Sequence, residues 1–230
     1  MGSPHPVPRT DPRGEPDCVL RWPRALAAGA GTLLLVLVLG CVTRQPVVAE
    51  LQLGVEHAIA RERTGVFLVV AHVINVSAAP SVAGFGAVVL VPAVLLLRRR
   101  WLGAARVLGV LGGALGIAHV LKVLVGTPRP PVSLWAEPVT NNGSFPSGHT
   151  TCAAAITIVL VLLAVGGAWR RGLALIGALY TVAVAMSRVY VGNHFLLDVV
   201  GGVLTAVAAW LLTVGIIDAA AFRTRGTGSR

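Results

Sequence analysis

The sequence has few charged residues for its length, and acidic residues are the scarcest of them. Only 12% of its 230 residues are charged and nine are Asp or Glu, whereas 55% are hydrophobic. Soluble domains carry about 25% charged residues, so this composition excludes an ordinary soluble domain and indicates a polytopic membrane protein. The few carboxylates form no cluster in the sequence that would hold Mg²⁺, and we expect neither a metal nor another cofactor.

Cysteine is also scarce, and the sequence lacks the patterns that are typical of nucleic-acid binding. The three cysteines, at positions 18, 41 and 152, do not support a disulfide framework. Lys and Arg outnumber Asp and Glu by 19 to 9, but the chain has no basic helix and no patch of interleaved basic and aromatic residues. We therefore expect no nucleic-acid partner. Most arginines flank apolar segments, where they fix the orientation of a membrane protein.

Apolar segments predict an all-α bundle of six membrane-spanning helices. Residues 46–79 differ, because they mix short apolar stretches with charged residues, which is typical of an interfacial or re-entrant helical segment. Glycines at 109, 112, 113 and 116 predict close helix contacts in the third span. The predicted spans cover residues 25–42, 81–97, 102–125, 150–168, 172–191 and 195–217.

The chain divides into one membrane domain and two tails. Residues 1–20 are rich in proline and predict a disordered tail, and residues 218–230 form a basic tail. The membrane domain covers residues 21–217.

Arginine clusters predict the orientation of this domain. If six helices cross the bilayer, the clusters all fall on one side, and the positive-inside rule makes that side cytoplasmic. Both tails are then cytoplasmic, and residues 46–79 are extracytoplasmic. The protein is expected in the cell membrane. The clusters lie at residues 21–24, 98–100, 170–171 and 223–225.

Three polar motifs lie at the ends of predicted spans. The first has Lys122 seven residues before Arg129, the second is residues 146–149 (Pro-Ser-Gly-His), and the third begins at Ser187 and ends at Asp198. Polar side chains are costly near hydrocarbon, so such a cluster is a functional-site hypothesis by default. The predicted orientation places all three motifs on the extracytoplasmic face.

These motifs suit chemistry at a phosphate group. Cleavage of a P–O bond needs cations on the anionic oxygens, an in-line nucleophile and an acid for the leaving oxygen. Lys122, Arg129 and Arg188 supply cations. Ser147 and Gly148 precede a span, where a hydroxyl and free backbone N–H groups can bind an anion. Cations that only anchor the chain at lipid headgroups, or Ser147 as a plain helix cap, would leave the histidines of the motifs unexplained.

The histidines supply the remaining groups. His194 and Asp198 are four residues apart and share a helix face, so the carboxylate can fix one imidazole nitrogen and leave the other free to attack. His149 ends the second motif. His72 and His119 match no motif, and we expect both to be structural.

Together the motifs resemble the three-part signature of the type 2 phosphatidic acid phosphatase superfamily. The resemblance implies that His194 attacks phosphorus to form a phosphohistidine, that Asp198 orients it and that His149 protonates the leaving group, without a metal. Many relatives carry an arginine where this chain has Thr127, so one accessory cation is missing. The phosphate-binding residues that the resemblance implies are Lys122, Arg129, Ser147, Gly148 and Arg188.

The resemblance implies an enzyme that hydrolyses a lipid phosphate or diphosphate held in the bilayer. A polyprenyl diphosphate carrier is the favoured substrate, with phosphatidic acid or phosphatidylglycerol phosphate as alternatives. A phosphotransferase that uses the same site stays open. A non-catalytic lipid binder would not need the set of His149, His194 and Asp198. The related vanadium haloperoxidases are soluble and larger, so the spans exclude them. Oligomeric state has no signal in the sequence.

Overall fold

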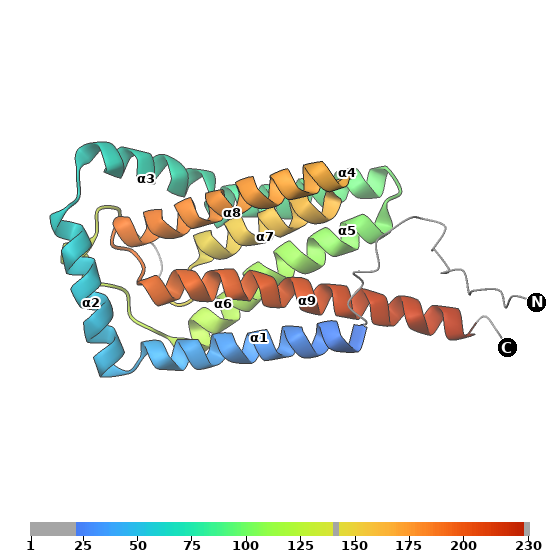
Figure 1. Ribbon diagram of the computed structural model, residues 1–230, viewed down its shortest axis with the longest axis horizontal. Coiled ribbons are helices and arrows are strands. Elements are labelled where there is room, and N and C mark those ends of the chain that lie inside the picture. The colour runs from blue at the N-terminus through green and yellow to red at the C-terminus, as the bar shows by residue number, and fades with distance from the viewer. Residues whose placement is uncertain (1–21, 140–142, 228–230) are drawn as a thin grey trace, which may run out of the picture.

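The computed structural model describes residues 22–139 and 143–227, and no strand occurs within these ranges (Figure 1). The all-α class expected from the sequence is therefore confirmed. Three short helices, η1 (Pro80–Gly84), η2 (Leu108–Gly112) and η3 (Val132–Leu134), lie between the longer ones. The α-helices are α1 (Trp22–Thr43), α2 (Pro46–Arg61), α3 (Gly65–Ser77), α4 (Phe85–Leu97), α5 (Trp101–Val107), α6 (Gly113–Val125), α7 (Gly148–Leu163), α8 (Gly167–Tyr190) and α9 (Leu196–Thr227).

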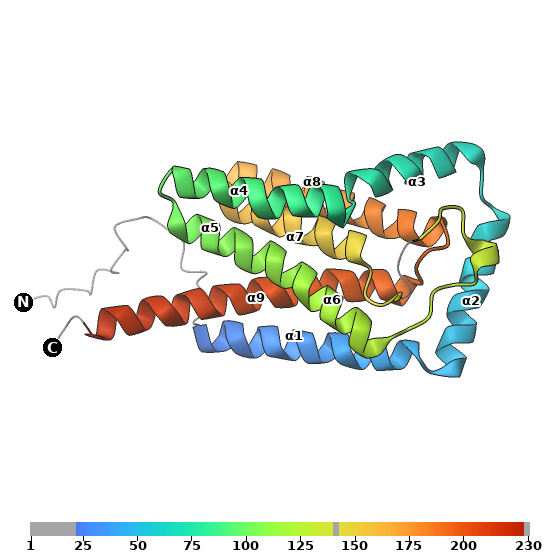
Figure 2. The same cartoon turned by 180° about the vertical axis from the view of Figure 1, so that it is seen from behind.

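Most of these helices run along one common axis, with α9 near the centre (Figures 1 and 2). α9 packs against α1, α6 and α7, and α7 also packs against α8. Small residues dominate the main core, including Ala155 of α7 and Ala206 of α9, and they allow close approach of the backbones. Gly109 bears out the expected close contact, because an added Cβ would lie 2.4 Å from Cγ2 of Thr213. Gly112 and Gly116 face open space.

Four helical segments among the described residues are long and apolar enough to cross a membrane. They correspond to four of the predicted spans and cover Trp22–Thr43, Trp101–Val125, Gly167–Tyr190 and Leu196–Phe222. The remaining two predicted spans, at 81–97 and 150–168, contain the shorter helices α4 and α7, of 13 and 16 residues. The total of six crossings therefore stays a prediction.

Residues 46–79 form two helices in different positions. α2 lies across one end of the bundle, at a steep angle to the other helices (Figures 1 and 2). α3 instead packs along α8 and leads through η1 into α4. Pro80 has no backbone N–H, and the regular helix breaks where it stands. The transverse direction of α2 suits an interfacial helix, whereas α3 adds its length to that of α4 along the bundle.

Two helix boundaries differ from the expected ones. The turn between α7 and α8 comes at residues 164–166, earlier than the predicted break at 169–171, because Gly166 adopts a left-handed φ of 91° there. α9 stays helical to Thr227, so residues 218–227 of the expected C-terminal tail continue the helix. The expected N-terminal tail, residues 1–20, lies outside the described residues.

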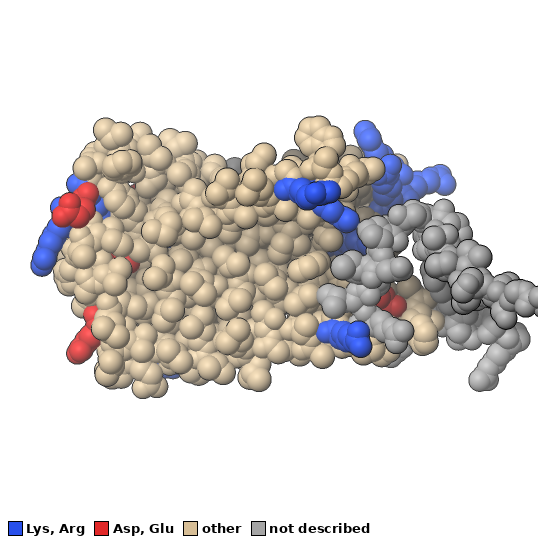
Figure 3. All heavy atoms as spheres, in the orientation of Figure 1, with Lys and Arg blue, Asp and Glu red and all other residues tan. Residues whose placement is uncertain are grey.

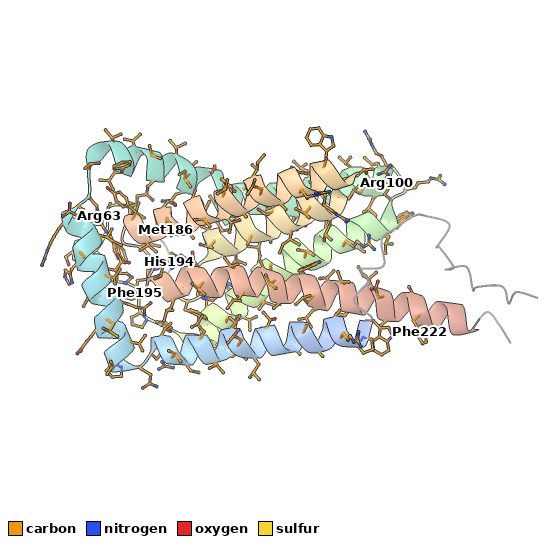
Figure 4. All side chains as sticks on the ribbon, viewed as in Figure 1. Arg63, Arg100, Met186, His194, Phe195 and Phe222 are labelled. Carbon is orange, nitrogen blue, oxygen red and sulfur yellow. The ribbon has the colours of Figure 1, made fainter. Side chains whose placement is uncertain are left out.

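Charged side chains gather at the two ends of the molecule, and the flank that Figure 3 shows is nearly free of them. Exposed arginines at 98–100 follow α4, and those at 170–171 lie in the first turn of α8, at the end where Phe222 lies (Figure 4). The opposite end carries charges of both signs, from α2 and the turn after it. An uncharged belt between charged ends is the surface expected of a bilayer protein.

Candidate active site

The three motifs meet at the end of the bundle that α2 covers. They lie at the end of α6, at the start of α7 and around the turn from α8 to α9. Figure 4 shows His194 and Phe195 at this end, near Arg63 and Met186 and far from Arg100 and Phe222. Residues that are up to 76 positions apart in the sequence, Lys122 and Asp198, therefore contribute to one site.

His194 stands in the turn between α8 and α9, and contacts fix its ring on both sides. Its side chain is 2% exposed, and its Nδ1 lies 3.4 Å from Oδ2 of Asp198. Nη1 of Arg129 donates to Nε2 over 3.1 Å. This arrangement favours the tautomer that carries the proton on Nδ1 and the lone pair on Nε2. Burial, and then the charges of Arg129 and Arg188, lower the pKa of His194 well below its usual value, which keeps the imidazole neutral and nucleophilic.

The turn that carries His194 depends on Gly192. This residue has a φ of 76°, and an added Cβ would lie 2.1 Å from the carbonyl oxygen of Leu134. Arg63 also holds the turn, since its Nε donates to the carbonyl of Tyr190 over 2.6 Å. The turn from α2 to α3 and the loop before α7 thus set the position of His194.

Asp198 is fully buried in the first turn of α9. Its Oδ2 accepts from the Ser144 hydroxyl and, over 2.9 Å, from the backbone N–H of Phe195. Its carbonyl accepts from the N–H of Ser147 over 2.9 Å. The second and third motifs are therefore joined directly, and the carboxylate is held where it can orient His194.

Lys122 lies beside the site, but its contacts differ from those expected of a simple phosphate ligand. Its ammonium donates to the carbonyl oxygens of Gly143, Ser144 and Pro146, at 2.8, 3.1 and 3.0 Å. An ammonium has three donors, so these contacts use all of them. Lys122 thereby holds the loop that carries Ser144, while its charge lies close enough to act on His194.

The two arginines meet at Asn193. Nη1 of Arg129 donates to the Asn193 carbonyl over 2.5 Å. In the amide orientation that satisfies its neighbours, the side-chain oxygen of Asn193 accepts from Nη2 of Arg188 over 3.1 Å. Burial lowers the pKa of Arg129 to about 10, which still leaves it charged at neutral pH. Nε of Arg188 is buried and has no partner among the described residues.

The second motif starts α7. Ser147 is the N-cap residue, but its hydroxyl accepts from Oγ1 of Thr150 over 3.2 Å instead of capping a backbone N–H. Gly148 is the first helical residue, and the half-buried His149 follows it. The charge of His149 acts on His194, so the two histidines are neighbours. The structure thus brings together all eight residues expected in the site.

Several residues of the site were not predicted. Glu137 accepts from Nδ2 of Asn75 over 3.2 Å and lies 3.0 Å from Nδ1 of His72. Asn193 and Ser144 join Glu137 as contacts of expected site residues. Ser144 and Glu137 lie outside the motifs, and Asn193 lies within the third motif but was not itself expected in the site. His72 contacts Glu137 from α3, while His119 is exposed.

α2 covers the site and brings a further carboxyl group to it. Oε1 of Gln52 accepts from the backbone N–H of Leu197, over 3.1 Å, at the start of α9. Glu56 follows one turn later, is 1% exposed, and has no partner for either oxygen among the described residues. Burial raises the pKa of Glu56 to about 8, while the charge of Arg63 lowers it and that of Asp198 raises it.

A cavity of about 690 Å³ adjoins the site between η1, α6 and the start of α7. Its lining combines the apolar side chains of Leu115 and Val123 with His119 and with the motif residues Lys122 and Gly148. A molecule with an apolar chain and an anionic head fits such a lining.

The described residues contain no group of three or more His, Cys, Asp or Glu side chains that could hold a metal ion. The titratable groups of the site are instead dominated by cations and imidazoles. The arrangement offers cations to a phosphate group and presents the neutral imidazole of His194 to it. Burial, and then the charge of Arg188, lower the pKa of His149 to about 3, so this imidazole is also neutral while no anion is bound.

Known proteins share this sequence pattern and fold. The family model of the PAP2 superfamily matches residues 103–221, a range that contains all three motifs. No curated protein matches the chain. A crystal structure described as the first transmembrane PAP2 type phosphatidylglycerolphosphate phosphatase, from Bacillus subtilis, has a TM-score of 0.71 and 24% sequence identity; the match covers 83% of this chain and 96% of that one. The structure of Aquifex aeolicus LpxE has a TM-score of 0.53 and 23% identity, and the match covers 73% and 93% of the two chains.

Proposed function

Because the chain belongs to the PAP2 superfamily, we propose that it is an integral membrane enzyme that hydrolyses a lipid phosphate or diphosphate. The observation that carries this proposal is the His194 ring, held by Asp198 on one nitrogen and by Arg129 on the other. Simple binding of an anion would not require a neutral, oriented imidazole, whereas nucleophilic catalysis does.

In the proposed first step, Nε2 of His194 attacks phosphorus in line with the bond to the lipid oxygen. The N–P bond forms as the P–O bond breaks, and the leaving oxygen takes a proton from the His149 imidazolium. A bound phosphate dianion favours this protonated form of His149. With a diphosphate substrate, the leaving group is the lipid monophosphate.

In the second step, water attacks the phosphorus of the phosphohistidine. Neutral His149 accepts a proton from this water, the P–N bond breaks, and its electron pair returns to Nε2 of His194. Inorganic phosphate then leaves. His149 thus acts as acid and then as base, as required for two successive displacements at one phosphorus.

The arginines stabilise the charge that develops on the phosphoryl oxygens. Arg129 already lies against Nε2, from where its guanidinium can bind an oxygen of the group that Nε2 attacks. Arg188 offers its buried Nε, and the N-terminus of α7 offers the hydroxyl of Ser147 and the backbone at Gly148. Lys122 supports this arrangement by holding the loop before α7.

The proposed substrate is a lipid, because the cavity beside the site is lined by both apolar side chains and motif residues. A polyprenyl diphosphate carrier is the first candidate. Phosphatidic acid and phosphatidylglycerol phosphate are the alternatives, and the latter is named in the description of the structurally similar Bacillus subtilis protein.

We place the site on the extracytoplasmic face and both termini in the cytoplasm. The support is the distribution of charge: the exposed arginine clusters at 98–100 and 170–171 lie at the end opposite to His194 (Figures 3 and 4). Arginine-rich turns favour the cytoplasmic side.

Phosphate release by the purified protein in detergent tests the proposal. The panel contains a polyprenyl diphosphate, phosphatidic acid and phosphatidylglycerol phosphate, each with excess EDTA, and His194→Ala is the matched control. We expect EDTA-resistant release from at least one lipid and none by the variant. A requirement for Mg²⁺, or the absence of release from every lipid, would refute the mechanism. Transfer of phosphate to an added alcohol in place of water would identify a phosphotransferase.

A further inference from the structure

Glu137 lies beside the phosphate-binding cations, although it belongs to none of the motifs. It stands in the loop between α6 and α7, and its side chain is 20% exposed. One of its oxygens, Oε2, lies 3.7 Å from Nη1 of Arg188, whose own side chain is 5% exposed. A charge pair with one deeply buried member is screened little by water, so this carboxylate affects what Arg188 can bind.

The position of Glu137 is fixed from three directions. Nδ2 of Asn75 donates to Oε2 over 3.2 Å, and Nδ1 of His72 lies 3.0 Å from Oε1. The backbone carbonyl of Glu137 accepts from the side-chain amide of Asn193 over 3.1 Å. Ser187 extends the network, because its hydroxyl donates to Oδ1 of Asn75 over 2.7 Å. The carboxylate is therefore a built part of the site.

The nitrogens of the Arg188 guanidinium consequently differ in their contacts. Nη1 and Nη2 face Glu137 and Asn193, whereas the buried Nε has no partner among the described residues. A phosphate group that binds Arg188 through Nε and Nη2 would share the guanidinium with the carboxylate of Glu137. The two anions repel each other and compete for one cation.

We propose that Glu137 is a positioning residue that holds Arg188 in place and lowers the affinity of the site for free phosphate. The proposal rests on the function proposed above, because phosphate is then the product that must leave after each turnover. The carboxylate offsets part of the positive charge of Arg129, Arg188 and Lys122. Without it, the site would hold phosphate more tightly and release it more slowly.

The test compares phosphate binding by the purified full-length protein and its Glu137→Gln variant. Gln keeps the size of Glu and one acceptor oxygen but removes the charge. Calorimetric titration with inorganic phosphate at pH 7 and low salt should show an affinity that is about five- to tenfold higher for the variant. Glu50→Gln, on the exposed surface of α2, is the matched control and should leave the affinity unchanged.

Glu137→Asp provides a second measurement of phosphate affinity. If Glu137→Gln does not fold, the result for Glu137→Asp tests the proposal by itself. Its shorter side chain moves the charge away from Arg188, so phosphate should bind more tightly than to the wild type and less tightly than to Glu137→Gln. A merely structural role predicts the opposite direction, since a displaced Arg188 would bind phosphate more weakly. Equal or weaker binding by the Glu137 variants would overturn the proposal.

Phosphate binding does not require turnover, so this test separates the two proposals. If the wild type hydrolyses lipid phosphates but loss of the Glu137 charge does not tighten binding, only the role of Glu137 is refuted. If phosphate binds as expected but no lipid phosphate is hydrolysed, only the enzymatic function is refuted. If the wild type binds phosphate too weakly to measure, Glu137→Gln should still bind it measurably, and the absence of binding by this variant would refute the role of Glu137.

Discussion

At the residue scale, the two histidines of the site differ in their surroundings, and their substitutions should have different effects. His194→Ala removes the proposed nucleophile, so we expect turnover to fall by several orders of magnitude on every substrate. His149→Ala removes the group that acts first as acid and then as base, which should cost about 10²–10⁴-fold on lipid phosphates. The loss in the first step should be smaller on p-nitrophenyl phosphate, because its leaving group needs little protonation.

Single-turnover rates of leaving-group release by both variants on both substrates check these expectations. Equal losses in this first step by His149→Ala on the lipid and on p-nitrophenyl phosphate would contradict the assignment of His149 as the acid. Near wild-type turnover by His194→Ala would contradict the nucleophile. Asp198→Asn should retain part of the activity, because the imidazole stays in place with a poorer partner.

Lys122 permits a second prediction, because its three contacts depend on the geometry of the ammonium group as well as on its charge. Its ammonium donates to three carbonyl oxygens, and a planar guanidinium cannot direct donors to all three in the same way. We therefore expect Lys122→Arg to lower kcat by about tenfold or more, although the charge is kept. Rates of phosphate release by Lys122→Arg and Lys122→Met measure this. A wild-type rate for Lys122→Arg would show that only the charge matters.

The sequence predicted the site residues that belong to spaced motifs, and missed those that act through the fold. His194 and Asp198 were predictable as a pair from their spacing, but the expected shared helix face was wrong, because His194 lies in the turn before α9 and Asp198 in the first turn of that helix. Ser144, Asn193 and Glu137 were not, since each lies in a loop whose course is set by contacts distant in the sequence. The role of Lys122 was predicted only in part, because its carbonyl partners depend on the path of residues 143–146.

At the element scale, α2 is the helix that closes the site, and Glu56 on its inner side makes its stability dependent on pH. The pKa of Glu56 is raised from 4.5 to about 8, so the folded protein keeps this proton while the unfolded chain loses it. The stability that the protonated form provides is present below about pH 4.5 and is lost as the pH rises through 8.

Glu56→Gln should therefore stabilise the protein, and by more at pH 8.5 than at pH 5.5. Melting temperatures of the two proteins in detergent, measured across this range, test the expectation. Glu50→Gln is the control, because this carboxylate is exposed on the same helix. A constant difference between Glu56→Gln and the wild type would mean that Glu56 is already ionised in the folded protein.

The sequence predicted which segments are helical better than it predicted where those helices pack. Apolar composition located α1, α8 and α9, whose lengths suit a bilayer. It did not reveal that α3 packs on α8, because α3 is short and its contacts come from tertiary structure. The turn before α8 was misplaced, since the chain turns at residues 164–166, where Gly166 has a positive φ, and not at the arginines that follow.

At the scale of the whole molecule, the opposite positions of the site and the arginine clusters predict the orientation in the membrane. After replacement of the native cysteines, a membrane-impermeant thiol reagent should label Val132→Cys on intact cells, because Val132 is 71% exposed at the end that carries the site. Arg100→Cys should react only after permeabilisation. Labelling of Arg100→Cys on intact cells would reverse the proposed orientation.

The cavity between η1 and α6 has a consequence for kinetics. Its walls include Leu115 and Val123 of a helix that is apolar enough to cross a membrane, so we expect a lipid substrate to reach Lys122 and Gly148 from within the bilayer plane. The concentration that the enzyme experiences is then the two-dimensional density of substrate among other lipids. Adding inert lipid or detergent at constant bulk substrate should lower the rate through surface dilution, whereas extra water should not.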